Sequence, residues 1–289
     1  MSTKNFVSYG DAESLMSGIA QKIAGGGSGG STKIGGISTR RIKRWVSKTW
    51  TGLSNFDRYH LWCDGENIYY SYSASHFVLD KSTSTWNTKT WNGLTQFDGY
   101  DIWTDGTNIY YSGEYGHYIL DKATSTWSQK SWSGAGNFYG RYIWTNGQYI
   151  YCSWGSTQLV LNKSTSTWSN KAWSGLTDFY SSNIWTDGTD FYYSDDNNQY
   201  ILNQSSSTWL AKSWSGNKPL QGKYIWSDGK ETYYSYSTNQ YVFTGAGWNT
   251  KKWNNEPFDG SYIWTDGEKF YYSTSSFTNV LEDIIMYQT

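Results

Sequence analysis

Residues 100–132 read YDIWTDGTNIYYSGEYGHYILDKATSTWSQKSW, and the order of aromatic, turn and polar residues in this stretch decides the fold. Four short runs rich in aromatic and β-branched residues are typical of strands. Asp105-Gly106, a strong two-residue hairpin signal, separates the first two runs, and a variable loop and a polar turn separate the others. The strands predicted in this way are 100–104, 108–112, 117–121 and 127–132.

The same pattern recurs six times between Arg41 and the end of the chain. A tryptophan after Ile or Leu returns every 41 residues, and after 38 residues in the last case, at Trp62, Trp103, Trp144, Trp185, Trp226 and Trp264. Two further series keep this spacing: Trp50, Trp91, Trp132, Trp173, Trp214 and Trp253; and Trp45, Trp86, Trp127, Trp168, Trp209 and Trp248. Four short strands per repeat, without helical periodicity, predict the blades of an all-β, six-bladed propeller.

The two ends of the repeat region are incomplete in complementary ways. Residues 41–50 align with a fourth strand that no earlier strands precede, whereas the last repeat, 262–283, has three strands and lacks a fourth. An N-terminal strand that completes the last blade would close the ring and remove two exposed sheet edges. We therefore expect a closed propeller over residues 41–289.

Residues 118–127 (YILDKATSTW) resemble the third and fourth strands of the kelch repeat in their Asp, Thr and spaced Trp. The sequence departs from kelch proteins in one respect, because Asp-Gly between the first two strands stands in place of the kelch Gly-Gly pair. The resemblance implies a kelch-like propeller in which the second-to-third-strand loops and the connections between blades share one face.

Composition excludes several classes of protein. Aromatic residues make up 20% of the 289 residues, charged residues 16%, and the formal net charge is −1, which indicates a folded chain with a Trp- and Tyr-rich core. No apolar run is long enough to span a bilayer, and the N-terminus lacks the pattern of a secretory signal. Nucleic-acid binding is not favoured, because the only basic cluster is short: Arg40, Arg41, Lys43 and Arg44. Cys63 and Cys152 replace other residues of the repeat and are expected to be packing residues.

Residues 1–40 differ in composition from the repeats. Residues 9–24 have the period of an amphipathic helix, with an apolar stripe at Leu15, Ile19 and Ile23, and 25–40 is expected to be a flexible Gly-rich linker. The stripe could dock on the propeller of the same chain, or it could mediate assembly with further copies or a larger particle.

The stretch 5–23 (NFVSYGDAESLMSGIAQKI) resembles the N-terminal attachment segments of tailed-bacteriophage tail fibres and receptor-binding proteins. The resemblance implies that residues 1–24 attach the chain to other virion proteins, with a possible homo-oligomer. The missing signal peptide fits a virion component, which leaves its host by lysis, and equally a cytoplasmic protein.

Enzyme motifs for zinc proteases, nucleotide binding and serine hydrolysis are missing, and no metal or cofactor is expected. His60, His76 and His117 occupy unlike places in the repeats, and the blades hold too few arginines for a sialidase. Paired carboxylates for glycoside hydrolysis stay open, because six acidic residues lie on candidate loops: Asp57, Asp98, Asp101, Glu114, Asp195 and Asp196.

The variable second-to-third-strand loops carry the candidate ligand-binding residues. Five aromatic residues lie in these loops: Tyr72, Tyr115, Trp154, Tyr236 and Phe277. Trp154, the only tryptophan outside the periodic series, is the first candidate for a platform on which a sugar ring stacks, although it could instead cover a neighbouring blade. Arg58, Arg141 and Lys223, in the connections between blades, could line the mouth of the central channel and favour acidic groups, or stay solvated.

Three functions remain open. The first is a non-enzymatic phage virion protein that binds a bacterial surface polysaccharide through one propeller face. The second is a structural or protein-interaction propeller of a tail, baseplate or capsid. The third is a polysaccharide-cleaving enzyme.

Overall fold

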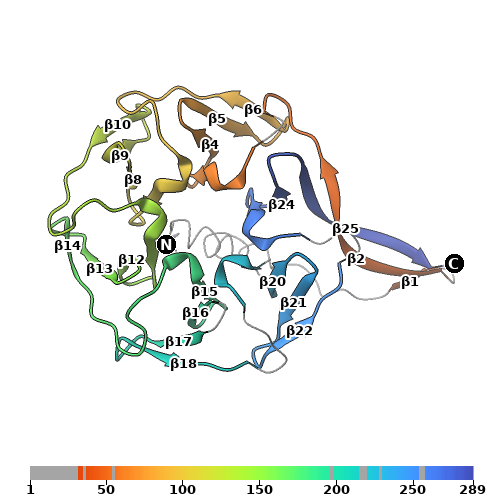
Figure 1. The fold of residues 1–289 in the computed structure, drawn as a ribbon. Helices are drawn as coiled ribbons and strands as arrows, with labels where there is room; N and C mark the ends of the chain where they lie inside the picture. Colours follow the sequence, from red (N-terminus) through yellow and green to blue (C-terminus); the bar gives the residue numbers. More distant parts are fainter. Residues whose placement is uncertain are drawn as a thin grey trace.

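The chain forms a ring of six β-sheets arranged like the blades of a propeller (Figure 1). The computed structural model describes residues 32–34, 37–53, 56–195, 198–214, 220–227, 230–253 and 258–288. The first strand of each blade lies toward the centre and the fourth at the rim (Figure 1). The predicted fold class, an all-β six-bladed propeller, is therefore confirmed.

Blades 1 to 5 are four-stranded antiparallel sheets whose strands follow one another in sequence order. Blade 1 contains β3 (Leu61–Cys63), β4 (Ile68–Tyr72), β5 (Ser75–Asp80) and β6 (Thr85–Thr88). Blade 2 contains β7 (Ile102–Thr104), β8 (Ile109–Gly113), β9 (Gly116–Asp121) and β10 (Thr126–Gln129). Blade 3 contains β11 (Ile143–Thr145), β12 (Ile150–Trp154), β13 (Thr157–Asn162) and β14 (Thr167–Asn170). Blade 4 contains β15 (Ile184–Thr186), β16 (Phe191–Ser194), β17 (Gln199–Asn203) and β18 (Thr208–Ala211). Blade 5 contains β19 (Ile225–Ser227), β20 (Thr232–Tyr236), β21 (Asn239–Phe243) and β22 (Trp248–Thr250).

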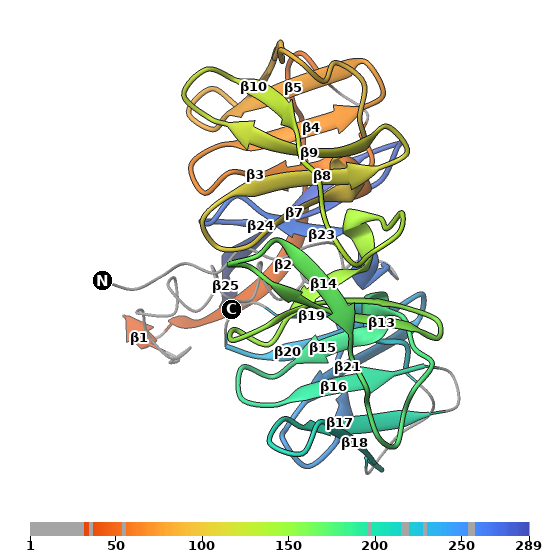
Figure 2. The ribbon, with the colours of Figure 1, turned by 90° about the vertical axis from the view of Figure 1, so that its left-hand side faces the viewer.

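Blade 6 joins the two ends of the repeat region, as predicted. It contains β23 (Ile263–Thr265), β24 (Phe270–Ser273) and β25 (Thr278–Gln288), and β25 pairs with the N-terminal strand β2 (Ile37–Lys48). The antiparallel register runs from Ser38 opposite Gln288 to Lys48 opposite Thr278, and Trp45 lies opposite Leu281. The short strand β1 (Thr32–Ile34) pairs with β2 and forms the outer edge of this five-stranded sheet. β1 and the neighbouring ends of β2 and β25 lie outside the ring (Figures 1 and 2).

One tryptophan from each periodic series meets at every boundary between blades. At the boundary of blades 1 and 2, the ring centroids of Trp62, Trp91 and Trp127 lie 5.5 to 6.1 Å apart. The other five boundaries repeat this arrangement with Trp103, Trp132 and Trp168; Trp144, Trp173 and Trp209; Trp185, Trp214 and Trp248; Trp226, Trp253 and Trp45; and Trp264, Trp50 and Trp86. Because every triad takes members from two blades, the sheets are held together by the aromatic core between them.

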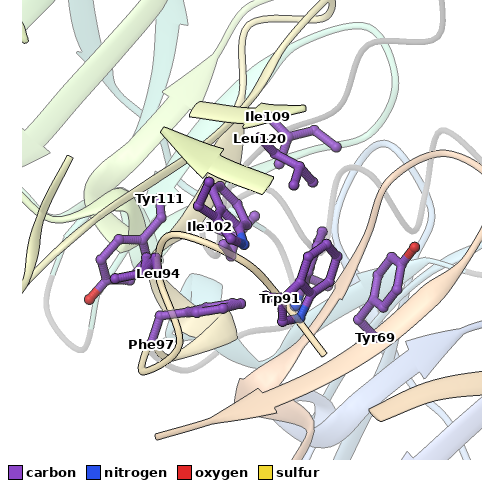
Figure 3. Packing of buried hydrophobic residues seen from close by; sticks show 10 residues of the cluster. Tyr69, Trp91, Leu94, Phe97, Ile102, Ile109, Tyr111 and Leu120 are labelled. Atoms are coloured by element: carbon purple, nitrogen blue, oxygen red, sulfur yellow. The ribbon is translucent and has the colours of Figure 1, made fainter. Parts of the chain in front are cut away.

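Figure 3 shows the core between blades 1 and 2, where Tyr69 and Phe97 flank Trp91. The tryptophan of the first strand also donates its Nε1–H to a buried serine at the same position of every second strand, as from Trp62 to Ser71 at 3.0 Å. A polar partner inside each blade therefore fixes the orientation of that indole.

Three local predictions were wrong. Residues 99–101 form a 3-10 helix rather than the start of a strand, and β10 ends at Gln129, so that Trp132 lies in the connection to blade 3. The Asp-Gly turn is a four-residue loop and not a two-residue hairpin. Asp105 shapes it by accepting hydrogen bonds from the backbone N–H groups of Thr107 and Asn108, at 2.9 and 2.7 Å.

The N-terminal segment differs in part from the expectation. β1 and the first residues of β2 fall within 25–40, which the sequence predicted to be a flexible linker. The predicted helix, with Leu15, Ile19 and Ile23, lies outside the described residues. No helix among the described residues is long and apolar enough to cross a membrane.

Candidate ligand-binding face

Six 3-10 helices, one before each innermost strand, form a circle on one face of the propeller, which we call the ring face. They are η1 (Arg58–His60), η2 (Gly99–Asp101), η3 (Gly140–Tyr142), η4 (Ser181–Asn183), η5 (Gly222–Tyr224) and η6 (Gly260–Tyr262). Consecutive helices approach so closely that a Cβ atom at Gly140 would collide with the carbonyl of Asp101. The circle is completed between the first and last helices, where the rings of Tyr59 and Tyr262 lie 5.3 Å apart.

The second-to-third-strand loops share this face with the connections between blades. The backbone N–H of Phe97, in the connection after blade 1, donates to the carbonyl of Ser73 at 3.0 Å. Phe179, after blade 3, donates in the same way to Gly155 at 3.1 Å. Loops from neighbouring parts of the ring therefore form one continuous surface.

All five aromatic residues that the sequence singled out in these loops are exposed, with 43 to 52% of their surface accessible: Tyr72, Tyr115, Trp154, Tyr236 and Phe277. Trp154 lies at the end of β12 and stacks on Tyr142 of η3, with ring centroids 5.5 Å apart and an interplanar angle of 8°. The ring of Tyr180, also exposed, has its centroid 6.5 Å from that of Tyr142. The second face of the Trp154 indole has no ring partner among the described residues.

The three candidate cations have different surroundings. Arg58 is buried and donates through Nη1 to the carbonyl of Ile263 at 2.7 Å, so it joins blade 6 to η1 rather than facing a ligand. Arg141 is half-buried, and its guanidinium lies 4.3 Å from the ring centroid of Tyr139 and 5.2 Å from that of Tyr100. Lys223 Nζ lies 4.9 Å from the ring centroid of Tyr224. Arg141 and Lys223 thus supply positive charge among tyrosine rings on the ring face.

Five tyrosines that surround these cations were missed in the sequence: Tyr59, Tyr100, Tyr139, Tyr142 and Tyr224. Tyr180, whose ring lies beside that of Tyr142, was missed as well. Four of them lie in a 3-10 helix shortly before the Ile-Trp or Leu-Trp of the first strand: Tyr59 and Tyr100 as its middle residue, and Tyr142 and Tyr224 as its last. That position is variable between repeats, and the same variability identified the loop aromatics.

The candidate carboxylates mostly stabilise turns. Asp57 accepts from the backbone N–H of Tyr59 at 3.1 Å, Asp98 from Ser73 at 3.1 Å and Asp195 from Asn198 at 2.7 Å. Asp196 lies outside the described residues, and Glu114 lies in the exposed loop between β8 and β9. Within the described parts of the chain, no three His, Cys, Asp or Glu side chains are grouped in a way that could hold a metal ion.

Asp101 differs from these carboxylates because it is only 5% exposed. Burial raises its pKa to about 7, against the opposing effect of the Arg141 guanidinium, whose Nη1 lies 3.8 Å from Oδ1. The carboxyl group is therefore partly protonated at neutral pH.

Replacing Asp101 with asparagine should change how stability depends on pH. Between about pH 4 and pH 7 the folded wild-type protein holds a proton on Asp101 that the unfolded chain releases, so this group makes the folded state less stable as pH rises. Asp101→Asn removes that contribution. From pH 4 to pH 8, the unfolding free energy of the variant should therefore rise relative to that of wild type, by at most about 4 kcal/mol.

Urea unfolding at a series of pH values measures this shift. Asp80→Asn is the control of opposite sign, because hydrogen bonds from Ser82 and Thr83 lower the pKa of the Asp80 carboxyl. The stability that Asp80 contributes is lost as pH falls through its folded pKa, which lies below about 4, so this variant should lose stability relative to wild type as pH rises toward 4 and differ from it by a constant amount from pH 4 to pH 8. Parallel profiles for wild type and Asp101→Asn would show that the carboxyl titrates alike in both states.

Comparison with known proteins identifies the fold and no family. No protein-family model matches the sequence, and no curated protein matches it. Among solved structures, YjhT is similar with a TM-score of 0.54 at 10% identity, over 83% of this chain and 99% of YjhT. The extracellular domain of the hybrid two-component system BT4673 of B. thetaiotaomicron has a TM-score of 0.50 at 10% identity, over 96% of this chain and 42% of that one.

An auxiliary nutrient binding protein from Bacteroides thetaiotaomicron VPI-5482 has a TM-score of 0.49 at 11% identity, over 84% of this chain and 77% of that one. At 10% identity, the similarities to YjhT and to the BT4673 domain concern the fold alone. A shared fold does not define a function.

Proposed function

We propose that the protein is a non-enzymatic adhesin that binds a bacterial surface polysaccharide through the ring face. The observation that supports this proposal is Trp154, an exposed indole held flat on Tyr142 beside Tyr180 and Arg141. Flat aromatic faces stack on the apolar faces of sugar rings, and neighbouring polar groups bond the hydroxyls. The stack with Tyr142 orders the indole before a ligand arrives, which reduces the entropy lost on binding.

The proposal includes a place on a phage particle, where residues 1–24 attach the chain to other virion proteins. Its support is the resemblance of 5–23 to tail-fibre attachment segments. Antibody labelling of purified particles would test this location independently of ligand binding.

Binding to an array of purified bacterial capsular and cell-wall polysaccharides tests the ligand. The full chain should bind at least one polysaccharide, and Trp154→Ala should weaken that binding about tenfold, the effect of losing one stacking platform. Tyr149→Ala is the matched control. Tyr149 is equally exposed but lies in the first-to-second-strand turn, at the opposite end of the strands. No binding to any polysaccharide would favour a structural or protein-interaction propeller instead.

A polysaccharide-cleaving enzyme is the second candidate, favoured by the raised pKa of Asp101 beside Asp98 on the ring face. A carboxyl group that stays protonated near pH 7 suits a general acid. Asp101 is nevertheless buried under the loop of Gly113, where little surface remains for a substrate. Release of reducing ends from the polysaccharides that bind would support this candidate, and its absence over long incubation would support the adhesin.

A further inference from the structure

The loop aromatics follow a pattern that repeats every second blade. The position directly after the buried serine of the second strand is aromatic in blades 1, 3 and 5, at Tyr72, Trp154 and Tyr236. In blades 2, 4 and 6 the same position holds Gly113, Asp195 and Thr274. Two blades therefore form one larger repeat on the ring face, although the core repeats with every blade.

Each of these three aromatics contacts the last residue of the 3-10 helix of its own blade. The ring centroids of Tyr72 and His60 lie 4.5 Å apart, with an interplanar angle of 45°. Those of Trp154 and Tyr142 lie 5.5 Å apart at 8°, and those of Tyr236 and Tyr224 lie 4.3 Å apart at 26°. Each pair has one exposed ring supported by a half-buried ring. We call these pairs the three platforms.

The backbone of the loops repeats in the same way. The residue after each platform aromatic has a positive φ, 53° at Ser73, 57° at Gly155 and 53° at Ser237. In blade 2 the positive φ falls instead at Gly116, three residues after Gly113. Non-glycine residues rarely adopt this conformation, so its recurrence in blades 1 and 5 indicates a shared loop structure and not only a shared residue type.

Buried polar side chains fix these loops to the next connection between blades. Gln158 Nε2 donates to the carbonyls of Gly155 and Phe179, at 2.7 and 3.3 Å. In blade 5, Gln240 Nε2 donates to Ser237 and Phe258, at 2.7 and 3.0 Å. In blade 1 the equivalent residue is His76, whose Nε2 lies 3.0 Å from the carbonyl of Thr95. The three platforms are thus held rigidly, as binding sites that are formed before ligand arrives should be.

The intervening blades do not carry such an aromatic pair, although His117 and Gln199 occupy the position of His76 and Gln158 in blades 2 and 4. In blade 2, Gly113 leaves room beside it for the Asp101 carboxyl and the Tyr111 hydroxyl, and a Cβ at this glycine would collide with Tyr111 Oη. In blade 4, Asp195 accepts from the Tyr193 hydroxyl at 3.2 Å. Tyr115 and Phe277 are exposed, but they lie later in their loops, and no ring contact joins either of them to a 3-10 helix of the described chain.

We propose that the three platforms are three equivalent sugar-binding subsites, related by a pseudo-threefold axis and separated by about 120° around the ring. This inference rests on the proposed function and extends it to the architecture of the ligand. The partner is a branched or repeating polysaccharide that presents several apolar sugar faces, because one chain then binds through three weak contacts at once. Each further contact acts at a high effective concentration, so avidity exceeds the affinity of one subsite.

Surface binding of the full chain to an immobilised capsular or cell-wall polysaccharide tests the inference, with the polysaccharide taken from those that bind on the array. Tyr72→Ala, Trp154→Ala and Tyr236→Ala should each weaken binding about tenfold, and the triple variant should lose at least a hundredfold. With a short oligosaccharide of the same polysaccharide in solution, calorimetry should give three equivalents bound to wild type and two to each single variant.

Tyr149→Ala is the matched control, since it removes an equally exposed aromatic side chain from the first-to-second-strand turn at the opposite end of the strands and should leave binding unchanged. If Trp154→Ala alone abolishes binding while Tyr72→Ala and Tyr236→Ala bind like wild type, the inference is wrong and the proposed function stands with a single site. If wild type binds no polysaccharide, the proposed function itself fails. A reading of one equivalent for wild type would also overturn the three-subsite arrangement.

Discussion

Trp45→Ala should lower the free energy of unfolding by about 3 to 5 kcal/mol, the usual cost of removing a buried tryptophan side chain. Trp45 is 5% exposed and comes from the strand that closes the ring. Its ring centroid lies 5.3 Å from Phe258, 6.1 Å from Trp226 and 6.2 Å from Tyr272. The substitution would leave a cavity at the boundary between blades 5 and 6. No covalent bond holds β2 to β25 there.

Urea unfolding followed by tryptophan fluorescence measures the effect, and Trp154→Ala is the matched control. Both variants lose one indole, but Trp154 is exposed, and its loss should change stability by less than about 1 kcal/mol. Similar midpoints for the two variants would contradict the role given to Trp45 in closing the ring.

Gly134→Ala should destabilise the protein by about 2 to 5 kcal/mol, through backbone strain and collision together. Gly134 lies in the connection between β10 and blade 3 and has a φ of 76°, a backbone conformation that residues with a side chain rarely adopt. A Cβ atom there would collide with the carbonyl of Trp168, and neighbouring Ser133 accepts from the Trp168 backbone N–H at 2.8 Å. Neither group can move without breaking the bond between the connection and β14.

Gly136→Ala provides a control two residues away in the same connection. A Cβ at Gly136 would meet nothing within 4 Å, so this variant should unfold within about 0.5 kcal/mol of wild type. Thermal and urea unfolding of the pair separate a specific requirement at Gly134 from a general effect of alanine in the loop. An equal loss in both variants would show that the close approach to Trp168 is not what requires glycine.

The fold was predictable because the core repeats. Each boundary between blades contains three tryptophans, one from each periodic series. The spacing of about 41 residues in the sequence therefore reflects the packing directly. The closing strand was predictable for the same reason, since Trp45 supplies the third ring at the last boundary. Local detail was less visible, because the Asp105 carboxylate shapes its turn by bonding backbone N–H groups that dipeptide statistics do not describe.

The candidate site was predictable only in part. Variability marked Tyr72, Trp154 and Tyr236 correctly as exposed loop aromatics. It could not show that each stacks on a ring from the 3-10 helix, because these partners are about 12 residues earlier and the helix itself was predicted as strand. Variability also misled at Arg58. This residue lies in a variable connection like Arg141, but it is buried and bonded to the carbonyl of Ile263.

The pairing of Ser38 with Gln288 has a mechanical consequence. Because β2 and β25 are antiparallel, the start of one strand lies beside the end of the other, and a pull that separates these two residues opens the ladder one pair at a time. Such peeling resists tension far less than sliding two strands past each other would. Under load applied at Ser38 and Gln288, the pairing of β2 with β25 should separate first, while the other five sheets keep their structure.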